Sequence, residues 1–439
     1  MEESPNYSSE SYIPFLADNG QVPEAGSTHV REGNDFGHQR KYKDILKTCC
    51  DVSFADAPWR RVSRYSFGII GLHEEVNDFY ETMRPKEQET ELRLKVIEHI
   101  TRVVHSLWPQ AQVEIFGSFR TGLYLPSSDL DMVIFGEWKS LPLSTLSQAL
   151  ENNGILNSDI NVIANATVPI IRLVHSPSGI RVDISFNMAN GVESAKLVKK
   201  MMKQHPALPK LVLILKQFLI HRGLNEVYNG GMSSYCLTLL IVSFLQGYHK
   251  PNFEPSANFG AALLEFFEHY GVNFNYDKVS IHFQSGGLYK PRRTGGNLLS
   301  VEDPLVSGHD VAKGTYLMNL LKMSFQNAFY LLSKAVTESL ITKTPVVSFL
   351  HLIVKVDPQV ITNRELMQSN HPKLMKKLSK LIDKLNEDQP VESASTSTPR
   401  STPKNFHKKK KFGPIDCTHV AMGLMQWMGS RYQLTVNSQ

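Results

Sequence analysis

Residues 116–133 read FGSFRTGLYLPSSDLDMV, and this stretch decides how the rest of the sequence is interpreted. Gly117 and Ser118 end an alternating strand pattern and begin a turn into a helix, where backbone N–H groups and a hydroxyl favour an anion. Asp129 and Asp131 then stand two residues apart at a second strand pattern, so their side chains are expected on the same face. The stretch therefore predicts an anion site beside a pair of carboxylates.

Two carboxylates on one face repel one another unless a cation lies between them. A third acid, Asp183, stands in the middle of RVDISF (residues 181–186), a strand pattern with apolar residues on both sides of the acid. Carboxylate oxygens are hard ligands that select Mg²⁺ or Mn²⁺. Gly-Ser followed by Asp-x-Asp is, by itself, as often a chance or turn motif; the strand context and the third aspartate favour a shared metal site.

The flanking sequence predicts a small mixed α/β unit. Upstream, apolar residues recur at helical spacing in two runs that end at Trp108-Pro109. A further helix is expected at about 141–152. Four strands are expected: Val113–Phe116, Leu130–Phe135, Val168–His175 and Ile180–Phe186. Residues 176–179 (SPSG) are a good hairpin turn between the last two.

After Gly191 the pattern becomes helical. Densely apolar or amphipathic runs predict helices at 208–220, 234–245, 261–270, 316–340 and 372–386. The last of these, PKLMKKLSKLIDKLN, is rich in lysine and predicts a solvated face rather than an RNA site. The following ESASTSTPRSTP is low-complexity linker.

Composition sets the class of protein. The chain has 439 residues, is 41% hydrophobic and carries a formal net charge of +5, with five lysines between Lys404 and Lys411. Its four cysteines make no metal-binding spacing, which indicates a reducing compartment. The N-terminus has no apolar signal core, and the best apolar stretch, 236–245, is too short to span a bilayer. We therefore expect a nuclear or cytoplasmic protein without a membrane anchor.

The pattern of Gly-Ser, Asp-x-Asp and a third strand aspartate resembles the DNA polymerase β nucleotidyltransferase superfamily. Residues 301–305 (VEDPL) resemble the nucleotide-recognition motif of one branch, the non-canonical poly(A) polymerases once called DNA polymerase sigma, which are TRAMP-type terminal nucleotidyltransferases. The same branch is indicated by YSFGIIGLHEE (65–75), LYLP (123–126), LKQFL (215–219) and GGMSSY (230–235). The resemblance covers about 58–340 and leaves both tails outside.

This resemblance implies an α/β plus α architecture, in which a polymerase β-like nucleotidyltransferase domain with a mixed sheet joins a mainly helical central domain. We expect the following segments: a disordered N-terminal arm (1–57), helices packing on the central domain (58–108), the catalytic domain (109–192), the central domain with its nucleotide-recognition region (193–345), a C-terminal helical extension (346–387), and a low-complexity linker with a basic tail (388–439).

The resemblance also implies an activity: template-independent addition of adenylates to an RNA 3′ end, in RNA decay, processing or translational control. Asp129 and Asp131 would bind two ions of Mg²⁺ or Mn²⁺, and Asp183 would bind the ion that activates the primer 3′-OH. ATP would be the substrate. The reaction is an in-line attack on the α-phosphorus with pyrophosphate leaving.

Further residues are assigned to the nucleotide by the same resemblance. Gly117 and Ser118 would contact the triphosphate, and Lys216 would neutralise it. Arg222 is assigned either to the same task or to an ordinary helix-end cation. Tyr235 would stack on the base, Ser194 would lie near the ribose, and the remaining positions of the nucleotide site would be Ser234, Glu302, Asp303, His309 and Asp310.

His309 leaves the base open. Adenylating members of the family usually carry Asn at this place, and His resembles enzymes that prefer UTP. The surrounding sequence is closer to the adenylating branch, so adenylation is preferred and uridylation is the alternative.

The RNA side is marked only by basic residues. Arg292 and Arg293 lie in a loop, and Lys408, Lys409, Lys410 and Lys411 lie in the tail; both groups could equally be solvated charge, and the tail group a nuclear import signal. The family implies a zinc-knuckle or other RNA-binding adaptor and an RNA helicase as partners. Competing interpretations are an inactive scaffold, or another transferase of the superfamily; the three aspartates and the VEDPL motif disfavour them.

Overall fold

The structure is a computed structural model that describes residues 57–156, 160–164, 169–247, 257–283, 289–291 and 298–387. All of these belong to the first of two compact units, Met1–Gln389. Residues 1–56 of the expected arm and the whole expected linker and tail lie outside the described residues. Only the first compact unit is therefore described below.

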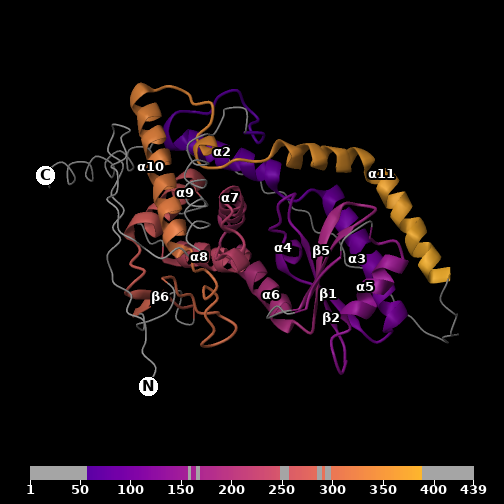
Figure 1. Cartoon of the computed structure of the whole chain (residues 1–439). Coiled ribbons are helices and arrows are strands. Elements are labelled where there is room, and N and C mark those ends of the chain that lie inside the picture. Colours follow the sequence, from indigo (N-terminus) through magenta and orange to yellow (C-terminus); the bar gives the residue numbers. More distant parts are fainter. Residues whose placement is uncertain are drawn as a thin grey trace, which may run out of the picture. The chain divides into compact units, whose positions relative to one another are not determined.

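A five-stranded mixed sheet forms the α/β half (Figure 1). Its spatial order is β1-β2-β5-β4-β3, with β2 and β5 parallel and the other neighbours antiparallel. The strands are β1 (Gln112–Ile115), β2 (Leu130–Phe135), β3 (Asn161–Ile163), β4 (Ile170–His175) and β5 (Ile180–Phe186). The mixed sheet predicted from the sequence is confirmed, and β3 is an additional short strand.

One face of this sheet carries the core of the α/β half. Alternate residues of β2, such as Leu130 and Met132, are fully buried against α3 (Glu87–Leu107) and α5 (Leu143–Asn152). The short helix α4 (Gly117–Thr121) follows β1. Because side chains alternate along a strand, the intervening residues of β2 and β5 face the opposite side.

The helical half is built from α2 (Gly68–Met83), α6 (Ala189–Gln204), α7 (Leu208–His221), α8 (Ser234–Gly247), α9 (Phe259–Glu268) and α10 (Met318–Thr342). Single turns η2 (Val227–Asn229), η3 (His269–Asn273) and η4 (Leu350–Leu352) and the ribbon of β6 (Val279–Ile281) with β7 (Tyr289–Pro291) complete it. Both α7 and α8 are buried on most sides, as their apolar sequences predict. None of the described helices is long and apolar enough to cross a bilayer.

Helices α2 and α3 were both expected to pack on the central domain, but each belongs to a different half of the structure. Helix α2 contacts α7, α9 and α10, whereas the apolar stripe of α3 belongs to the core of the sheet. The prediction for 58–108 was therefore wrong for α3. The break at Pro85 lets the two apolar stripes point at different cores, which periodicity within each helix does not reveal.

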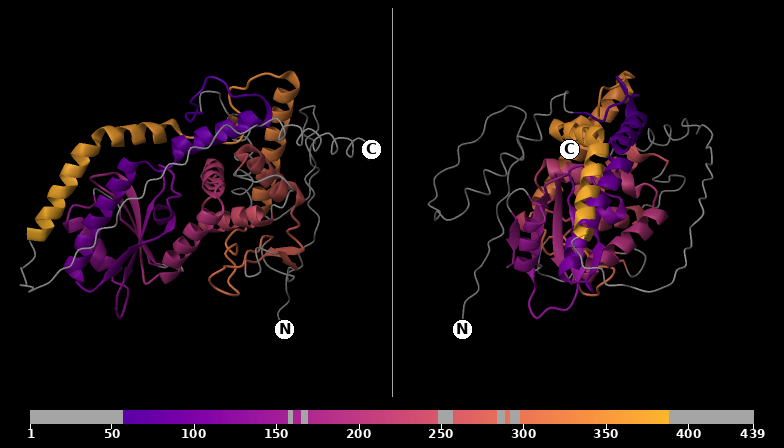
Figure 2. Two further views of the ribbon diagram at one scale, coloured as in Figure 1. Left: turned by 180° about the vertical axis from the view of Figure 1, so that it is seen from behind. Right: turned by 90° about the vertical axis from the view of Figure 1, so that its right-hand side faces the viewer.

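The Lys-rich helix is longer than its sequence suggested. Helix α11 runs over Pro358–Glu387 with Pro372 inside it, and it packs along α3 (Figure 2). Pro372 looked like a helix start because proline is favoured in the first turn. Leu378 and Ile382 are buried, so one face of α11 completes the core of the α/β half.

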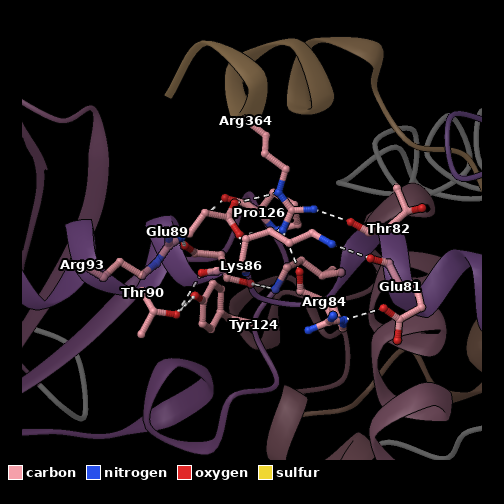
Figure 3. Close-up of polar contacts among 12 residues, drawn as sticks. Glu81, Thr82, Arg84, Lys86, Glu89, Thr90, Arg93, Tyr124, Pro126 and Arg364 are labelled. Carbon is pink, nitrogen blue, oxygen red and sulfur yellow. Dashed lines mark hydrogen bonds and ion pairs between the residues drawn. The ribbon is translucent and has the colours of Figure 1, made fainter. Parts of the chain in front are cut away.

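A buried ion pair fastens α11 to the junction of α2 and α3 (Figure 3). Arg364 donates to both carboxylate oxygens of Glu89 at 2.7 Å and to the backbone oxygens of Thr82 and Arg84. The backbone N–H of Lys86 also donates to Glu89, at 2.9 Å. Every charge in this cluster therefore has close partners, which is the condition for keeping an ion pair inside a protein.

Candidate active site

Asp131 and Asp183 lie side by side on neighbouring parallel strands. They are direct partners in the register of β2 and β5, and Asp129 immediately precedes β2. The residues on either side of them, such as Leu130 and Val182, point into the core. The carboxylates therefore project from the opposite face of the sheet, where the sequence pattern placed them.

Asp131 is held in an unfavourable electrostatic position. Burial, followed by the nearby charges of Asp183 and Asp129, raises its pKa to about 7. The charge of Lys216 and the backbone N–H of Ser118 act in the opposite direction. A carboxylate with like-charged neighbours and little solvent is the environment that a bound cation would relieve.

Gly117 allows this approach of backbone to carboxylate. Its φ of +62° lies in the left-handed region, and a Cβ atom there would overlap the carboxylate of Asp131. Ser118 follows at the start of α4, with its N–H on Asp131. The glycine is therefore required both for its backbone angle and for the space that it leaves.

Two arginines hold the outer carboxylates, and the sequence reasoning missed both. Arg172 donates to both oxygens of Asp183, at 2.9 and 2.7 Å, and Arg181 donates to Asp129 at 2.5 Å. The signal for Arg172 was available: the turn at 176–179 pairs residue 175 with 180, which puts 172 opposite 183. Arg181 stands two residues before Asp183, and is on the same face for that reason.

The donor set fits a divalent metal in kind. Three carboxylates from adjacent chain segments provide hard oxygen ligands. Among the described residues, however, no three His, Cys, Asp or Glu side chains are arranged as a metal-binding group. Asp129 and Asp183 are turned onto their arginines, so metal binding requires these two ion pairs to loosen.

Lys216 belongs to the same site. Its side chain is buried and donates from Nζ to the backbone oxygen of Leu123 at 3.0 Å. Burial lowers its pKa to about 8, while Asp131 and Asp129 pull it upward. It therefore lies where a positive charge offsets the aspartates. Its predicted contact with a triphosphate stays a prediction.

A second cluster contains four of the residues predicted to contact the nucleotide. The Tyr235 hydroxyl donates to Asp303 at 3.0 Å, and Ser194 of α6 is hydrogen-bonded to the same hydroxyl. Asp303 also faces His309, whose Nδ1 lies 3.3 Å from Oδ2 of the acid. The His309 side chain is 57% exposed, whereas that of Asp303 is 8% exposed. The buried acid therefore positions both a tyrosine and an exposed imidazole.

The two acids on either side of this cluster brace the loop instead of facing outward. Glu302 pairs with His282 and accepts from Gly308 N–H at 3.1 Å. Asp310 accepts from the N–H groups of Val301 and Ala312 at 3.0 and 2.9 Å. Their oxygens hold the turn that carries His309, and their contact with a nucleotide stays a prediction.

Arg222 is buried at the end of α7, donates to the backbone oxygens of Phe218 and Ile353, and stacks on the Phe218 ring. These contacts join α7 to the segment after η4, as the helix-end alternative expects, and a contact with the triphosphate stays a prediction. Ser234 is exposed at the first turn of α8. Arg292, Arg293 and Lys408–Lys411 lie outside the described residues.

Comparison with known proteins now decides the family. Residues 72–203 match the model of the central palm domain of the mitochondrial-like poly(A) RNA polymerases, and residues 258–309 match that of the Cid1 family poly A polymerases. The chain is 36% identical over 365 residues to the inactive non-canonical poly(A) RNA polymerase protein Trf4-2 of Drosophila melanogaster, covering 79% of this chain and 89% of the relative. The chain belongs to the non-canonical poly(A) RNA polymerases.

Other members of this poly(A) polymerase family are longer. Poly(A) RNA polymerase gld-4 of Caenorhabditis elegans is 34% identical over 381 residues, which are 81% of this chain and 43% of gld-4. The chain likewise spans 37% of poly(A) RNA polymerase CID14 of Cryptococcus neoformans.

Solved structures support the polymerase β-like fold. The polymerase core of TRAMP, described as an RNA surveillance complex, matches with a TM-score of 0.60 and 34% identity, over 65% of this chain and 94% of that one. The Cid1 poly(U) polymerase matches with a TM-score of 0.53 at 20% identity, over 60% and 94% of the two chains, and shares the fold.

Proposed function

We propose that this polymerase adds nucleotides, chiefly adenylates, to the 3′ end of RNA without a template. The observation that carries the proposal is the pairing of Asp131 with Asp183 in register on two parallel strands, with Asp129 beside them. The backbone of Gly117 and Ser118 lies against the Asp131 carboxylate. The base-facing cluster of Tyr235, Asp303 and His309 is joined to this site through Ser194 on α6, which packs on α4.

The three aspartates would hold Mg²⁺ or Mn²⁺. When bound, a pair of such ions stabilises the attacking 3′ oxygen and the leaving pyrophosphate oxygen. Asp183 would help to take the proton of the 3′-OH as that oxygen attacks the α-phosphorus. Gly117 and Ser118 would face the triphosphate, and Lys216 would balance the charge of Asp131. Arg172 and Arg181 would release the outer carboxylates and turn toward phosphate, because guanidinium pairs well with either group.

Adenylation is favoured over uridylation by the names of the relatives that are more than 30% identical, which are poly(A) polymerases. His309 favours the alternative. Its ring is held by Asp303, the acid that also receives the Tyr235 hydroxyl, so base stacking and base-edge contact are coupled. Uridylation therefore remains the second candidate.

The nucleotide assignment is tested by offering the purified chain each NTP with an oligo(A) primer and Mg²⁺ or Mn²⁺. We expect A to be incorporated in preference to U by the wild type, and by His309→Asn as well, because Asn is compatible with adenine. Product lengths and identities on a denaturing gel give the answer. Preferential addition of U that His309→Asn converts to A would overturn the adenylate assignment and leave the enzyme class standing.

Partners and location follow the same reasoning. The polymerase core of TRAMP, which this chain resembles, is described as part of an RNA surveillance complex. We propose a similar arrangement for this chain, with a zinc-knuckle or other RNA-binding adaptor and an RNA helicase, in the nucleus or cytoplasm.

A further inference from the structure

A cavity of about 860 Å³ lies beside α11, away from the base-facing cluster. One wall is formed by Asp357 and by α11 as far as Lys377, and the other by Arg93 of α3, the segment 126–128 and the β4–β5 hairpin. None of the activities discussed above uses this cavity. It is distinct from the predicted nucleotide site but shares the segment that leads into Asp129.

Arg93 is the unusual member of its lining. The residue is 2% exposed, and its Nη2 donates to the backbone oxygen of Ser128 at 3.1 Å. Its Nε and Nη1 atoms are buried and have no hydrogen-bond partner in the described part of the chain. The ring of Tyr124 lies 4.5 Å from the guanidinium and covers one face of it. Two unsatisfied donors on a buried cation indicate a missing anionic or polar acceptor.

The cavity is positively charged as a whole. Its charged lining residues are five cations, Arg93, Arg181, Arg364, Lys373 and Lys377, and one acid, Asp357. Arg364 is paired with Glu89 and Arg181 with Asp129, so the excess positive charge comes from Arg93, Lys373 and Lys377. Val174 and Leu366 add apolar side chains that are 47% and 53% exposed, so both a charged chain and a flat apolar group can be accommodated.

Arg181 connects the cavity with the chemistry. It donates to the backbone oxygen of Ser127 at 2.5 Å and to Asp129 at 2.5 Å, while lining the cavity. An anion entering the cavity meets a guanidinium that touches a catalytic carboxylate. The cavity therefore shares Arg181 with the acid site, on the side of Asp129.

We propose that this cavity binds the sugar-phosphate backbone of the RNA strand upstream of its 3′ end. The proposal rests on the proposed RNA 3′-end activity and names where that RNA runs. Twenty residues of α11 rise about 30 Å, which corresponds to roughly nine stacked nucleotides at about 3.4 Å each. A strand of this length reaches Lys373 and Lys377, whereas a trinucleotide at the acid site does not.

The test uses the full chain and two matched charge-reversal pairs on α11. Lys373→Glu with Lys377→Glu changes the cavity; Lys376→Glu with Lys380→Glu makes the same charge change at the same spacing, on exposed lysines that do not line the cavity. Binding of fluorescent 15-nucleotide oligo(A) is measured by anisotropy in EDTA over a range of salt concentrations. Extension of triadenylate and of the 15-mer is measured in Mg²⁺.

For the cavity pair we expect roughly ten-fold weaker binding of the 15-mer. The slope of the logarithm of the binding constant against the logarithm of the salt concentration should fall in magnitude by about 1.4 or more, since each of two lost phosphate contacts contributes about 0.7 for a single strand. KM for the 15-mer should rise, and extension of triadenylate should be unchanged. The control pair should behave as the wild type, apart from a small effect of net charge.

Equal weakening by both pairs, or no change in either, would overturn the proposal. Unchanged RNA binding together with loss of binding to a labelled poly-aspartate peptide in the cavity pair alone would assign the cavity to an acidic protein instead. A wild type that extends neither primer with any NTP would contradict the proposed function, while the anisotropy measurement still decides whether RNA occupies the cavity.

Discussion

Carboxylates in two regions of this chain have different kinds of neighbours. At the junction of α2, α3 and α11, Glu89 receives two bonds from Arg364 and one from a backbone N–H. Nearby, Glu75 accepts from the indole of Trp59, from Ser348 and from two backbone N–H groups. Asp131, by contrast, lies beside two like charges.

The difference separates structure from function. Each structural carboxylate has several donors that offset part of the loss of water, although burial still raises the pKa of Glu75, so removing either group should cost stability. Asp131 has a poorly compensated charge, so its removal should cost activity alone. The following experiments test this contrast, from the largest expected effect to the smallest.

The largest effect is expected at the acid site. Asp131→Asn and Asp183→Ala should each lower nucleotide incorporation by roughly 10²–10³-fold or more, the scale of losing one preorganised electrostatic group. Incorporation into oligo(A) is measured with each enzyme at equal concentration. Asp131→Asn should also leave the melting temperature in EDTA unchanged or higher, because it removes like-charge repulsion.

A drop in melting temperature for Asp131→Asn comparable to that of a structural variant would erase the contrast. Undiminished tailing in Asp183→Ala would remove the catalytic assignment itself.

A large stability effect is expected at the buried ion pair. Arg364→Ala leaves Glu89 buried without its partner, which should lower the free energy of unfolding by about 3–5 kcal/mol. Urea unfolding monitored by tryptophan fluorescence measures it. The double variant Arg364→Met with Glu89→Met is the control, since an apolar replacement of similar size should recover much of the loss. A loss below about 1 kcal/mol in Arg364→Ala would place the pair with ordinary surface ion pairs.

A smaller effect is expected at a pair of buried histidines. His99 Nδ1 lies 3.1 Å from His175 Nε2, and burial lowers the pKa of His99 to about 4 and, with the charge of His99 and Lys377, that of His175 to about 3. Both rings are therefore neutral in the folded chain and gain protons more readily on unfolding. The stability they contribute is complete above the unfolded pKa of about 6.5 and is lost as pH falls.

Between pH 7 and pH 5 we expect the wild type to lose about 1–2 kcal/mol for each histidine. Urea unfolding at several pH values measures this loss, and His99→Gln with His175→Gln serves as the comparison because Gln does not titrate. A pH dependence as steep in that variant as in the wild type would assign the effect to other groups.

Many helices and strands could be predicted from the sequence because each has a clear local pattern of apolar residues. The β-rich runs at 130–135 and 180–186 identified β2 and β5, and the apolar runs identified α7 and α8. Helix α3 was recognised as a helix but assigned to the wrong half. Its apolar stripe shows that one face is buried, but it does not show which element covers that face. The extension over 346–387 was expected to be helical, but the amphipathic run was read as beginning at Pro372, whereas α11 is one helix from Pro358.

The candidate site likewise contains residues that the sequence predicted and residues that only the structure revealed. The three aspartates and Gly117 were predicted from residue type and spacing, and Tyr235 from the family resemblance; the structure brings the aspartates and Gly117 together and pairs Tyr235 with Asp303. Arg172 and Arg181 were not weighed, although strand register could have placed them opposite and beside the acids. Glu302, Asp310 and Arg222 were assigned to the nucleotide, whereas their hydrogen bonds hold loops and helix ends.

The sequence by itself determined the order of most helices and strands, and the strand context of three aspartates, beyond the Gly-Ser and Asp-x-Asp pattern alone, indicated a metal-dependent chemistry. The tertiary structure decided which charges meet: Asp131 with Asp183, Arg364 with Glu89, and the cations of α11 with Arg93 and Arg181. The physical reason is that periodicity is a property of neighbours along the chain, whereas electrostatic partners are chosen by packing between segments that are distant in it.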